Sequence, residues 1–279
     1  MKSRCRLYRV VRCSVLRVWT LVKRGEENMK ISRLNSIEQY VIAKETASID
    51  ELCEVFGVSK NTIRRDLNDL EARGHISKVY GGVTATPNAG AVPMPVRSEI
   101  NSSDKALIGR LAAEEIEDGD TIFIDSGTTT LQLLRYLNGH KNLTIITHSL
   151  GALSEAAKYE GLSVISLGGV YNYTTDSFVG LSTFESLSSM KIHKAFMGAT
   201  GVSIENGMMN TTFLEGEIKR GVVQRATQVF LMADSSKLDK EAVITFCKLD
   251  EITAFITDRQ PPERYTEFFE REGIRVRFG

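Results

Sequence analysis

The stretch SIDELCEVFGVSKNTIRRDLNDLEARG, residues 48–74, decides the fold of the N-terminal part of this chain. Ser48 can cap a helix, and Glu51 three residues later completes the capping-box pattern. Gly57 ends that helix because glycine tolerates a left-handed conformation. Ser59 then caps a second helix, which runs to the end of the stretch. A helix, a tight turn containing glycine and a second capped helix are typical of a helix-turn-helix.

The second helix of the pair has an apolar face and a polar face. Ile63, Leu67 and Leu70 recur at i, i+4 and i+7 and form one apolar stripe. The opposite face and the helix start carry side chains suited to bases and phosphates, since arginine pairs with guanine and asparagine with adenine. The candidate DNA contacts on this helix are Ser59, Lys60, Asn61, Thr62, Arg64, Arg65 and Asn68. We expect Asp66, Asp69 and Glu71 to lie away from this surface.

Two flanking patterns complete the module over residues 29–86. Apolar side chains at helical spacing predict a first helix that ends near Lys44, and they are Leu34, Ile37, Val41 and Ile42. The segment HISKVYGGV, residues 75–83, predicts a strand, a Gly-Gly turn and a return strand. This would form a wing that brings Lys78 and Tyr80 near DNA. A small helical protein–protein module is the alternative for the whole segment.

The net charge of zero conceals an uneven distribution. Residues 1–28 carry eight Lys and Arg against two Glu, residues 29–86 carry eight against eight acids, and residues 87–279 carry 19 against 25. The candidate DNA-binding module is not basic overall, so its cations must gather on one surface. We interpret residues 1–28 as a basic tail ahead of a start at Met29, and a nucleic-acid-binding arm is the alternative.

The composition narrows the class of protein. The 279 residues are 42% hydrophobic and 25% charged, as in ordinary folded proteins. No run approaches the roughly 18 apolar residues of a membrane-spanning helix. The four cysteines, Cys5, Cys13, Cys53 and Cys247, lack zinc-site spacing. We therefore expect a cytoplasmic protein with free thiols, no membrane contact, no metal site and no cofactor.

Residues 100–279 are predicted to form an α/β domain, joined to the first module by a linker over 87–99 that holds three of the five prolines. Short, continuously apolar segments predict strands at 121–124, 144–147, 163–167, 194–199, 228–233, 253–257 and 274–276. Helices are predicted at 103–116, 130–137, 150–159, 181–189, 213–226 and 263–272. Continuous hydrophobicity favours a parallel sheet that is covered on both faces.

Polar and glycine residues follow the carboxyl ends of five of these strands, where α/β domains bind ligands. Gly127 allows close backbone approach, and the threonines and helix amides after it can hold phosphate oxygens. The candidate ligand-binding residues are Asp125, Gly127, Thr128, Thr129, Ser149, Gly168, Gly169, Gly201, Glu215, Lys219, Asp234 and Lys237. Hydroxyls, glycine amides, carboxylates and lysines together suit a polyol that carries a phosphate.

Residues 49–83 resemble the DNA-binding region of the DeoR family, whose pattern runs VS, TIRRDL, LE, G and a basic–GG ending. The segments IFIDSGTTT, LTIITHSL, LGG, AFMGATG, LEGEIKR and ADSSK resemble the effector domain of that family. The resemblance implies a repressor with a winged helix-turn-helix and a domain folded like ribose-5-phosphate isomerase, which binds a phosphosugar without catalysis. Tyr80 stands where many members have His, and His148 stands where Asn is common.

The partners implied are operator DNA, a phosphorylated sugar effector and further copies of the chain. Because one recognition helix reads few base pairs, we expect a dimer or tetramer. A sugar-phosphate isomerase or aldolase with an appended DNA module is an alternative, since Asp125, Glu215, Lys219, Asp234 and Lys237 could supply acid–base groups. A nucleoid-type or RNA-binding protein is another. The fused DNA module favours the repressor.

Overall fold

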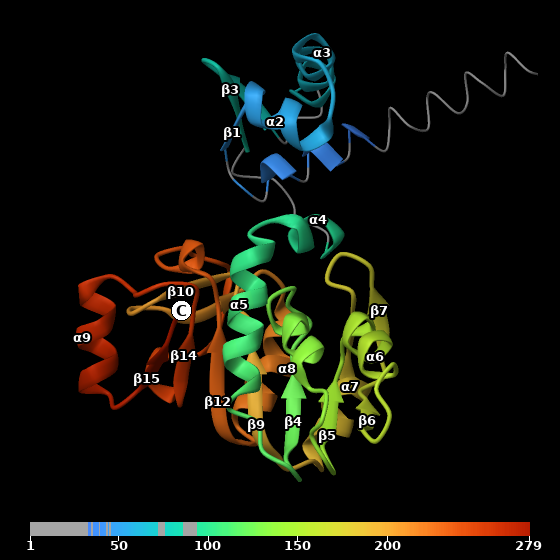
Figure 1. Ribbon diagram of the computed structural model, residues 1–279, viewed down its shortest axis with the longest axis vertical. Coiled ribbons are helices and arrows are strands. Elements are labelled where there is room, and N and C mark those ends of the chain that lie inside the picture. Colours follow the sequence, from blue (N-terminus) through green and yellow to red (C-terminus); the bar gives the residue numbers. More distant parts are fainter. Residues whose placement is uncertain are drawn as a thin grey trace, which may run out of the picture. The chain divides into compact units, whose positions relative to one another are not determined.

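The computed structural model describes residues 33–34, 36–38, 40–42, 44, 46–71, 76–85 and 94–279. The chain divides into two compact units, Met1–Val92 and Pro93–Gly279, which we call the N-terminal and C-terminal units (Figure 1). The expectations for the basic tail, for the end of the second helix at Gly74 and for linker residues 87–93 lie outside the described residues.

The N-terminal unit has the predicted helix-turn-helix and wing. Described residues between Arg33 and Lys44 are helical, as expected for the first helix. The next elements are β1 (Thr46–Ser48), α2 (Ile49–Phe56), α3 (Lys60–Glu71), β2 (Ile76–Val79) and β3 (Gly82–Ala85). The wing strands β2 and β3 pair antiparallel, and β1 adds a third strand beside β3. The strand β1 was not predicted, because three residues show no periodicity and its pairing partner lies far along the chain.

Only half of the predicted capping box forms at the start of α2. The Ser48 hydroxyl accepts a hydrogen bond from the Glu51 amide over 3.1 Å, and Gly57 ends the helix with φ of 63°. The Glu51 carboxylate instead accepts hydrogen bonds from the Tyr40 hydroxyl at 2.7 Å and from Lys44 Nζ at 2.5 Å. This side chain therefore ties α2 to the first helix.

The two glycines of the wing serve different purposes. Gly81 lies in the turn with φ of +79°, a left-handed conformation that side chains disfavour. A Cβ on Gly82 would lie 2.4 Å from the carbonyl oxygen of Ala47 in β1. The close approach of β1 to the wing therefore depends on the missing side chain at this position.

The C-terminal unit is built on a seven-stranded sheet in which every pair of neighbouring strands is parallel. In spatial order the strands are β15 (Arg275–Arg277), β14 (Ala254–Ile256), β12 (Ala226–Met232), β9 (Ile192–Met197), β4 (Thr121–Ile124), β5 (Thr144–Thr147) and β6 (Ser163–Ser166). All seven were predicted as strands. From β4 the strands continue in chain order toward one edge of the sheet (β5, β6), and from β9 they continue in chain order toward the other edge (β12, β14, β15). The strand order therefore switches direction between β4 and β9.

Successive residues of the central strands enter two separate cores, one on each face of the sheet. Ile122 and Ile124 belong to one core, and Phe123 between them belongs to the other. The first core lies under α5 (Ser102–Ala113), the 3₁₀ helix η1 (Thr130–Tyr136) and α6 (Leu150–Ala156). The second lies under α7 (Leu181–Ser188), α8 (Phe213–Val223) and α9 (Glu263–Arg271). Each fully buried large apolar side chain contributes roughly 1.5–3 kcal/mol.

Several short elements were not predicted. A second sheet contains β10 (Gly201–Ser203), β11 (Gly207–Asn210) and β13 (Ile244–Cys247), and a hairpin joins β7 (Val170–Asn172) to β8 (Ser177–Val179). Two 3₁₀ helices, η2 (Ser235–Lys237) and η3 (Leu249–Glu251), also form. Residues 94–99, assigned above to the linker, form the helix α4 (Met94–Glu99) of the C-terminal unit. The helix predicted at 130–137 forms as the 3₁₀ helix η1.

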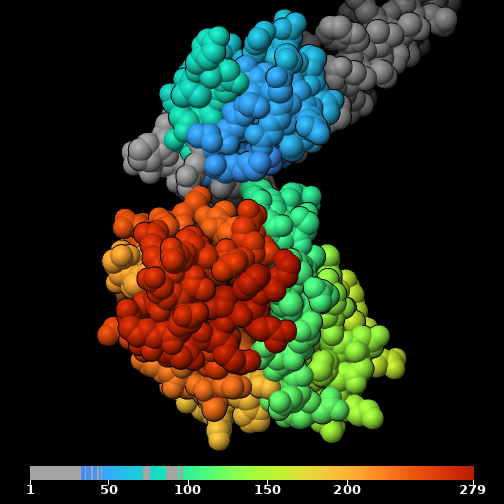
Figure 2. Space-filling view, turned by 60° about the vertical axis from the view of Figure 1, so that its left-hand side comes forward, coloured from blue at the N-terminus to red at the C-terminus, as the bar shows by residue number. Residues whose placement is uncertain are grey.

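The strand β6 departs from the expectation of a sheet covered on both faces. All four of its residues are exposed, and Val164 and Ile165 have 36% and 38% of their surface accessible. Helices pack on both faces of the central strands, and Figure 2 shows the final residues of the chain, in red, on one face of the C-terminal unit. Among the described residues, no helix combines the length and apolar character needed to cross a membrane.

Candidate functional site

The helix α3 presents the polar face that its sequence predicts. Ile63, Leu67 and Leu70 are fully buried, which orients the helix on the core of the N-terminal unit. The exposed residues include Asn61, Arg64, Arg65 and Asn68. At the helix start, the Ser59 hydroxyl accepts a hydrogen bond from the Thr62 amide over 3.2 Å. An exposed face with two arginines and two asparagines can contact bases and phosphates.

Two of the three carboxylates of α3 are paired with cations outside this helix. Asp66 is buried and bonds to the guanidinium of Arg33, with Nε 2.7 Å from Oδ2. Glu71 pairs with Lys78 of the wing, whose Nζ lies 2.8 Å from Oε2. Lys60 lies 2.5 Å from Asp50 and so is not a free cation in this structure. Asp66 and Glu71 are thus paired with Arg33 and Lys78, while Arg64 and Arg65 stay exposed.

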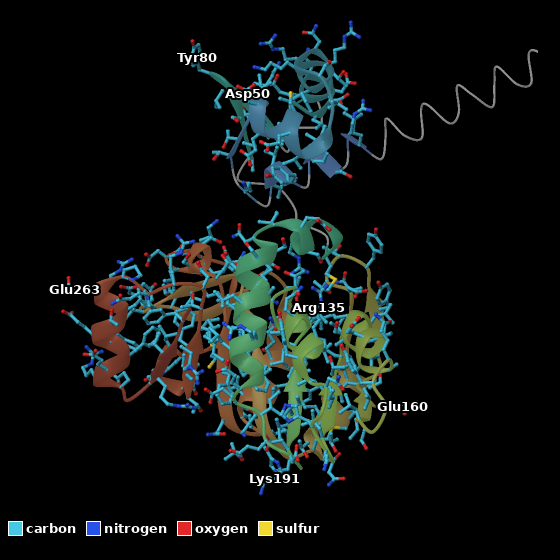
Figure 3. The ribbon with its side chains drawn as sticks, in the orientation of Figure 1. Asp50, Tyr80, Arg135, Glu160, Lys191 and Glu263 are labelled. Carbon is cyan, nitrogen blue, oxygen red and sulfur yellow. The ribbon has the colours of Figure 1, made fainter. Side chains whose placement is uncertain are left out.

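The wing residues that we predicted to contact DNA lie in two different environments. Tyr80 is fully exposed at the turn, and Figure 3 shows its side chain pointing away from the unit. Lys78 donates a hydrogen bond from Nζ to Asn68 Oδ1 over 2.7 Å. The wing is therefore attached to α3 through side chains that are themselves candidate DNA contacts.

In the C-terminal unit, polar residues converge where the strand order switches between β4 and β9, the usual ligand position in such sheets. Asp125 follows β4 and is fully buried. Its Oδ2 accepts a hydrogen bond from the Gly198 amide at 2.9 Å and forms an ion pair with Lys219 Nζ, also at 2.9 Å. Lys219 also donates to the Gly198 carbonyl at 3.0 Å. We call the buried group of Asp125, Ser126, His148, Asn210, Glu215 and Lys219 the central polar cluster.

Glu215, on the first turn of α8, is the second carboxylate of this cluster. It accepts hydrogen bonds from the Ser126 hydroxyl at 3.0 Å and from the Asn210 amide at 2.8 Å. Burial alone would raise the pKa of Glu215, but the Lys219 ammonium and these hydrogen bonds lower it below its ordinary value. The carboxylate is therefore ionised and satisfied by the protein.

His148 is a residue of the cluster that the list of candidate site residues missed. It follows β5, stacks on Phe123, and places Nε2 4.0 Å from Asp125 Oδ1. Burial lowers the pKa of His148, although the carboxylates of Asp125 and Glu215 act in the opposite direction. Neither ring nitrogen has a hydrogen-bond partner, and neither does Asp125 Oδ1. A neutral imidazole offers one donor and one acceptor here.

Arg97 of α4 is the second missed residue. Its Nε is buried without a hydrogen-bond partner, and its charge interacts with the carboxylates of Glu215, Asp125 and Asp176. Burial lowers the pKa of Arg97, and these three carboxylates raise it. This segment was predicted to be a linker, and no sequence pattern indicates that the Arg97 charge acts on the cluster.

The loop after Asp125 contains three candidate ligand-binding residues, Gly127, Thr128 and Thr129, and hydrogen bonds of Thr130 hold its backbone. The Thr130 hydroxyl donates to the carbonyls of Asp125 and Gly127, at 2.7 and 2.8 Å. Thr128 and Thr129 are buried, and within the described residues their hydroxyls donate no hydrogen bond. These two hydroxyls are therefore available as donors to a ligand.

Asp234 and Lys237 belong to a neighbouring group around η2. Asp234 caps this short helix by accepting a hydrogen bond from the Ser236 amide at 3.1 Å, and it accepts another from the Asn101 side chain at 3.3 Å. The charges of Asp234, Lys237 and Arg97 all act on Lys105. Lys105 thus interacts with the charges of this group and donates a hydrogen bond to the Arg97 carbonyl.

Four of the predicted ligand-binding residues have packing partners. The Ser149 hydroxyl caps α6 by accepting a hydrogen bond from the Ala152 amide. The Gly168 carbonyl accepts a hydrogen bond from Thr183, and a Cβ on Gly169 would lie 2.4 Å from the same threonine hydroxyl. A Cβ on Gly201 would lie 2.2 Å from a backbone oxygen of Lys240. These contacts account for the residue types without a ligand.

Asp125, His148 and Glu215 could each offer one metal-ligand atom, and these atoms lie within 4.8 Å of one another. The Lys219 ammonium, 2.9 Å from Asp125, and the Arg97 charge would both repel a metal cation. A metal-binding histidine usually donates its second nitrogen to a protein acceptor, and His148 has none. The cluster suits a hydrogen-bonding ligand better than a metal.

A winged helix-turn-helix joined to an α/β unit with a buried polar cluster defines a class of DNA-binding regulators that carry their own sensor. Family profiles agree, because the DeoR-like helix-turn-helix domain matches residues 33–88 and the DeoR C terminal sensor domain matches residues 100–259. The chain belongs to the DeoR family of transcriptional regulators. Its members are regulators and not enzymes, so the isomerase alternative is set aside.

Curated relatives match along most of their length. The chain is 40% identical to the HTH-type transcriptional regulator IolR of Bacillus subtilis, over 89% of this chain and 99% of that protein. It is 32% identical to the HTH-type transcriptional repressor GlcR of Bacillus subtilis, over 88% and 94%. It is 30% identical to the glycerol-3-phosphate regulon repressor of Escherichia coli, over 82% and 91%.

Solved structures match about half of the chain. Ribose 5-phosphate isomerase A of Neisseria gonorrhoeae is 18% identical with a TM-score of 0.38, over 52% of this chain and 55% of that one. eIF2B beta of Chaetomium thermophilum is 14% identical with a TM-score of 0.43, over 61% and 54%.

Proposed function

We propose that this chain represses a sugar or polyol catabolic operon and releases its operator DNA when a phosphorylated sugar binds at the central polar cluster. One observation carries the ligand-binding half: Asp125 Oδ1 and both nitrogens of His148 are buried without partners. Buried polar atoms are nearly always hydrogen-bonded. Neighbouring hydroxyls of a polyol both donate and accept, and so match this set.

The phosphate requires specific local donors. Residues 87–279 carry 19 Lys and Arg against 25 Asp and Glu, so overall charge does not attract an anion. We propose that the loop Gly127–Thr129, Lys219 and Lys237 supply donors, with Asp125 and Asp234 placed for hydroxyls. The hydroxyls of Thr128 and Thr129 that donate no hydrogen bond within the described residues support this assignment.

For the DNA-binding half, we propose that the exposed face of α3 reads base edges in a major groove while the wing contacts phosphate. One helix reads too few base pairs for useful specificity, so a dimer or tetramer bound to a palindrome or repeat is proposed. The exposed positions of Asn61, Arg64, Arg65 and Tyr80 support this arrangement.

The class of sugar is suggested by a more specific resemblance. The segments SKNTIRRDLNDL, IFIDSGTTT and HKAFMGATG resemble those of the repressor of the myo-inositol catabolic operon. The 40% identity to IolR extends over 99% of that protein. We propose a phosphorylated intermediate of inositol breakdown as the inducer.

The test is a thermal-shift screen of phosphorylated sugars and their free counterparts, followed by operator release with the compounds that bind. The operator is first selected from random DNA by the full chain. We expect a phosphosugar, and not its free form, to stabilise the protein and release DNA. Thr128→Ala and Lys237→Ala should bind DNA but respond weakly. The control is Lys191→Ala, since Figure 3 shows Lys191 at the opposite end of the C-terminal unit from α4.

Equal action of free and phosphorylated sugars would contradict the phosphate assignment. Full inducibility of Lys237→Ala would contradict the proposal that Lys237 donates to the phosphate.

A further inference from the structure

Arg97 is half-buried, and its Nε is buried without a hydrogen-bond partner among the described residues. The carboxylates that face it have other partners. Asp125 Oδ2 is occupied by Gly198 and Lys219, and Glu215 by Ser126 and Asn210. A guanidinium without a bidentate partner, beside a site built for a polyol, is suited to the anionic group of a ligand.

Arg97 differs from the residues of the central polar cluster in its position along the chain. It lies on α4, which begins two residues after Val92, the last residue of the N-terminal unit. In Figure 1, α4 lies beyond the end of the sheet toward which the arrow of β4 points. Arg97 therefore lies on the first helix after the N-terminal unit, and its charge acts on two carboxylates of the cluster.

The helix α4 is attached to the C-terminal unit by a small number of polar contacts. The Met94 amide donates to the Thr174 carbonyl at 3.1 Å, and the Lys105 ammonium donates to the carbonyls of Arg97 and Ile100. Burial lowers the pKa of that ammonium to about 8. These bonds hold the backbone of α4, and the Arg97 side chain is left to respond to a ligand.

We propose that Arg97 binds the anionic group of the effector and that this contact shifts α4, which carries the signal along the chain to the DNA-binding unit. The inference rests on the proposed function and adds the residue that couples the two units. The shift in DNA-competent population is limited by the difference in effector affinity between the two positions of α4.

The first experiment titrates the full chain with inorganic phosphate in a calorimeter. Saturable binding is expected for the wild type, and about 10- to 100-fold weaker binding for Arg97→Gln, because a charge-assisted hydrogen bond is lost. Arg97→Lys should fall between them, since it keeps the charge and loses the planar fork. Lys191→Gln should bind as the wild type does. Wild-type affinity in Arg97→Gln would overturn the proposal.

The second experiment measures hydrogen exchange of the amides of residues 94–99 with and without saturating phosphate. The wild type should show protection of α4, and Arg97→Gln should show none at the same phosphate concentration. Protection confined to residues 127–130 in the wild type would show that the anion binds without engaging α4, and would overturn the coupling.

The operator assay separates the two levels of the proposal. If phosphosugars release DNA from the wild type and from Arg97→Gln alike, the coupling through Arg97 is wrong and the proposed function stands. If no phosphosugar releases DNA from the wild type, the proposed function fails and the inference fails with it. Release is measured relative to the operator affinity of each variant without ligand.

Discussion

Lys78 Nζ lies 2.7 Å from Asn68 Oδ1, so the wing and α3 are joined by two residues that we assign to DNA contact. The same ammonium lies 2.8 Å from the Glu71 carboxylate. A phosphate that approaches Lys78 would replace Glu71 as its anion, while Asn68 keeps the wing in register with the helix. In the free protein, these two side chains therefore already join the wing to α3.

Lys78→Ala should weaken binding to operator DNA and to random-sequence DNA by the same factor, because a phosphate contact carries no sequence information. The slope of log affinity against log salt should fall by about one. Filter binding at several salt concentrations measures both quantities, with Lys191→Ala as the matched control. A change in sequence preference with an unchanged slope would show that Lys78 reads bases instead.

Arg64→Ala and Arg65→Ala should each weaken operator binding, since a base-contacting arginine supplies roughly 1–3 kcal/mol of discrimination. Neither side chain packs in the core, so thermal unfolding should stay unchanged. Gel-shift titrations against operator and random DNA provide the measurement. The control is Arg110→Ala, an exposed arginine of α5 in the C-terminal unit. If both variants kept full affinity and preference, α3 would not be the reading helix.

The two wing glycines should respond differently to alanine. Gly82→Ala places a Cβ against the Ala47 carbonyl and should cost about 2–4 kcal/mol of stability, with loss of DNA binding as β1 separates from the wing. The Cβ of Gly81→Ala would lie in open space, so only the left-handed backbone conformation disfavours the alanine, and we expect a loss of about 1–2 kcal/mol of stability. Urea unfolding of the two variants compares them. Equal stabilities would contradict the close approach of β1.

Lys105→Met should change how stability depends on pH. The folded-state pKa of Lys105, about 8, lies below its ordinary 10.5, so the unfolded chain binds this proton more tightly. The buried charge therefore destabilises the fold below pH 8, and this penalty disappears as pH rises toward 10.5. Relative to Lys105→Met, the free energy of unfolding of the wild type should rise by about 3 kcal/mol between the folded-state and the ordinary pKa of Lys105. Urea unfolding at pH 7 to 10 tests this, and a constant difference would refute it.

The sequence predicted elements whose residues carry their own periodicity. Ile63, Leu67 and Leu70 orient α3 without reference to the rest of the chain, and continuous apolar runs such as 121–124 identified every strand of the main sheet. The three-residue strand β1 was missed because its only signal is its pairing with β3. Short elements are determined by partners that a local pattern does not contain.

Residues of the candidate site could be predicted where they follow a predicted strand or begin a predicted helix. They could not be predicted where a distant element supplies the side chain. Asp125 and Glu215 were identified from the loop after β4 and from the start of α8. His148 had been noted only as a departure from the family, and Arg97 was assigned to a linker. Ser149 looked like a ligand residue because a helix cap uses the same hydroxyl chemistry as a binding site.

The central polar cluster and Arg97 have a consequence for proton balance. The carboxylates of Asp125 and Glu215 interact with the cations Lys219 and Arg97, Asp176 adds a third carboxylate that acts on Arg97, and burial lowers the pKa of the His148 imidazole among them. A phosphate dianion bound beside these groups would add negative charge in a region shielded from water, and it would raise the affinity of His148 for a proton. Effector binding would then take up protons from the buffer, so its measured heat would vary with the ionisation enthalpy of the buffer chosen.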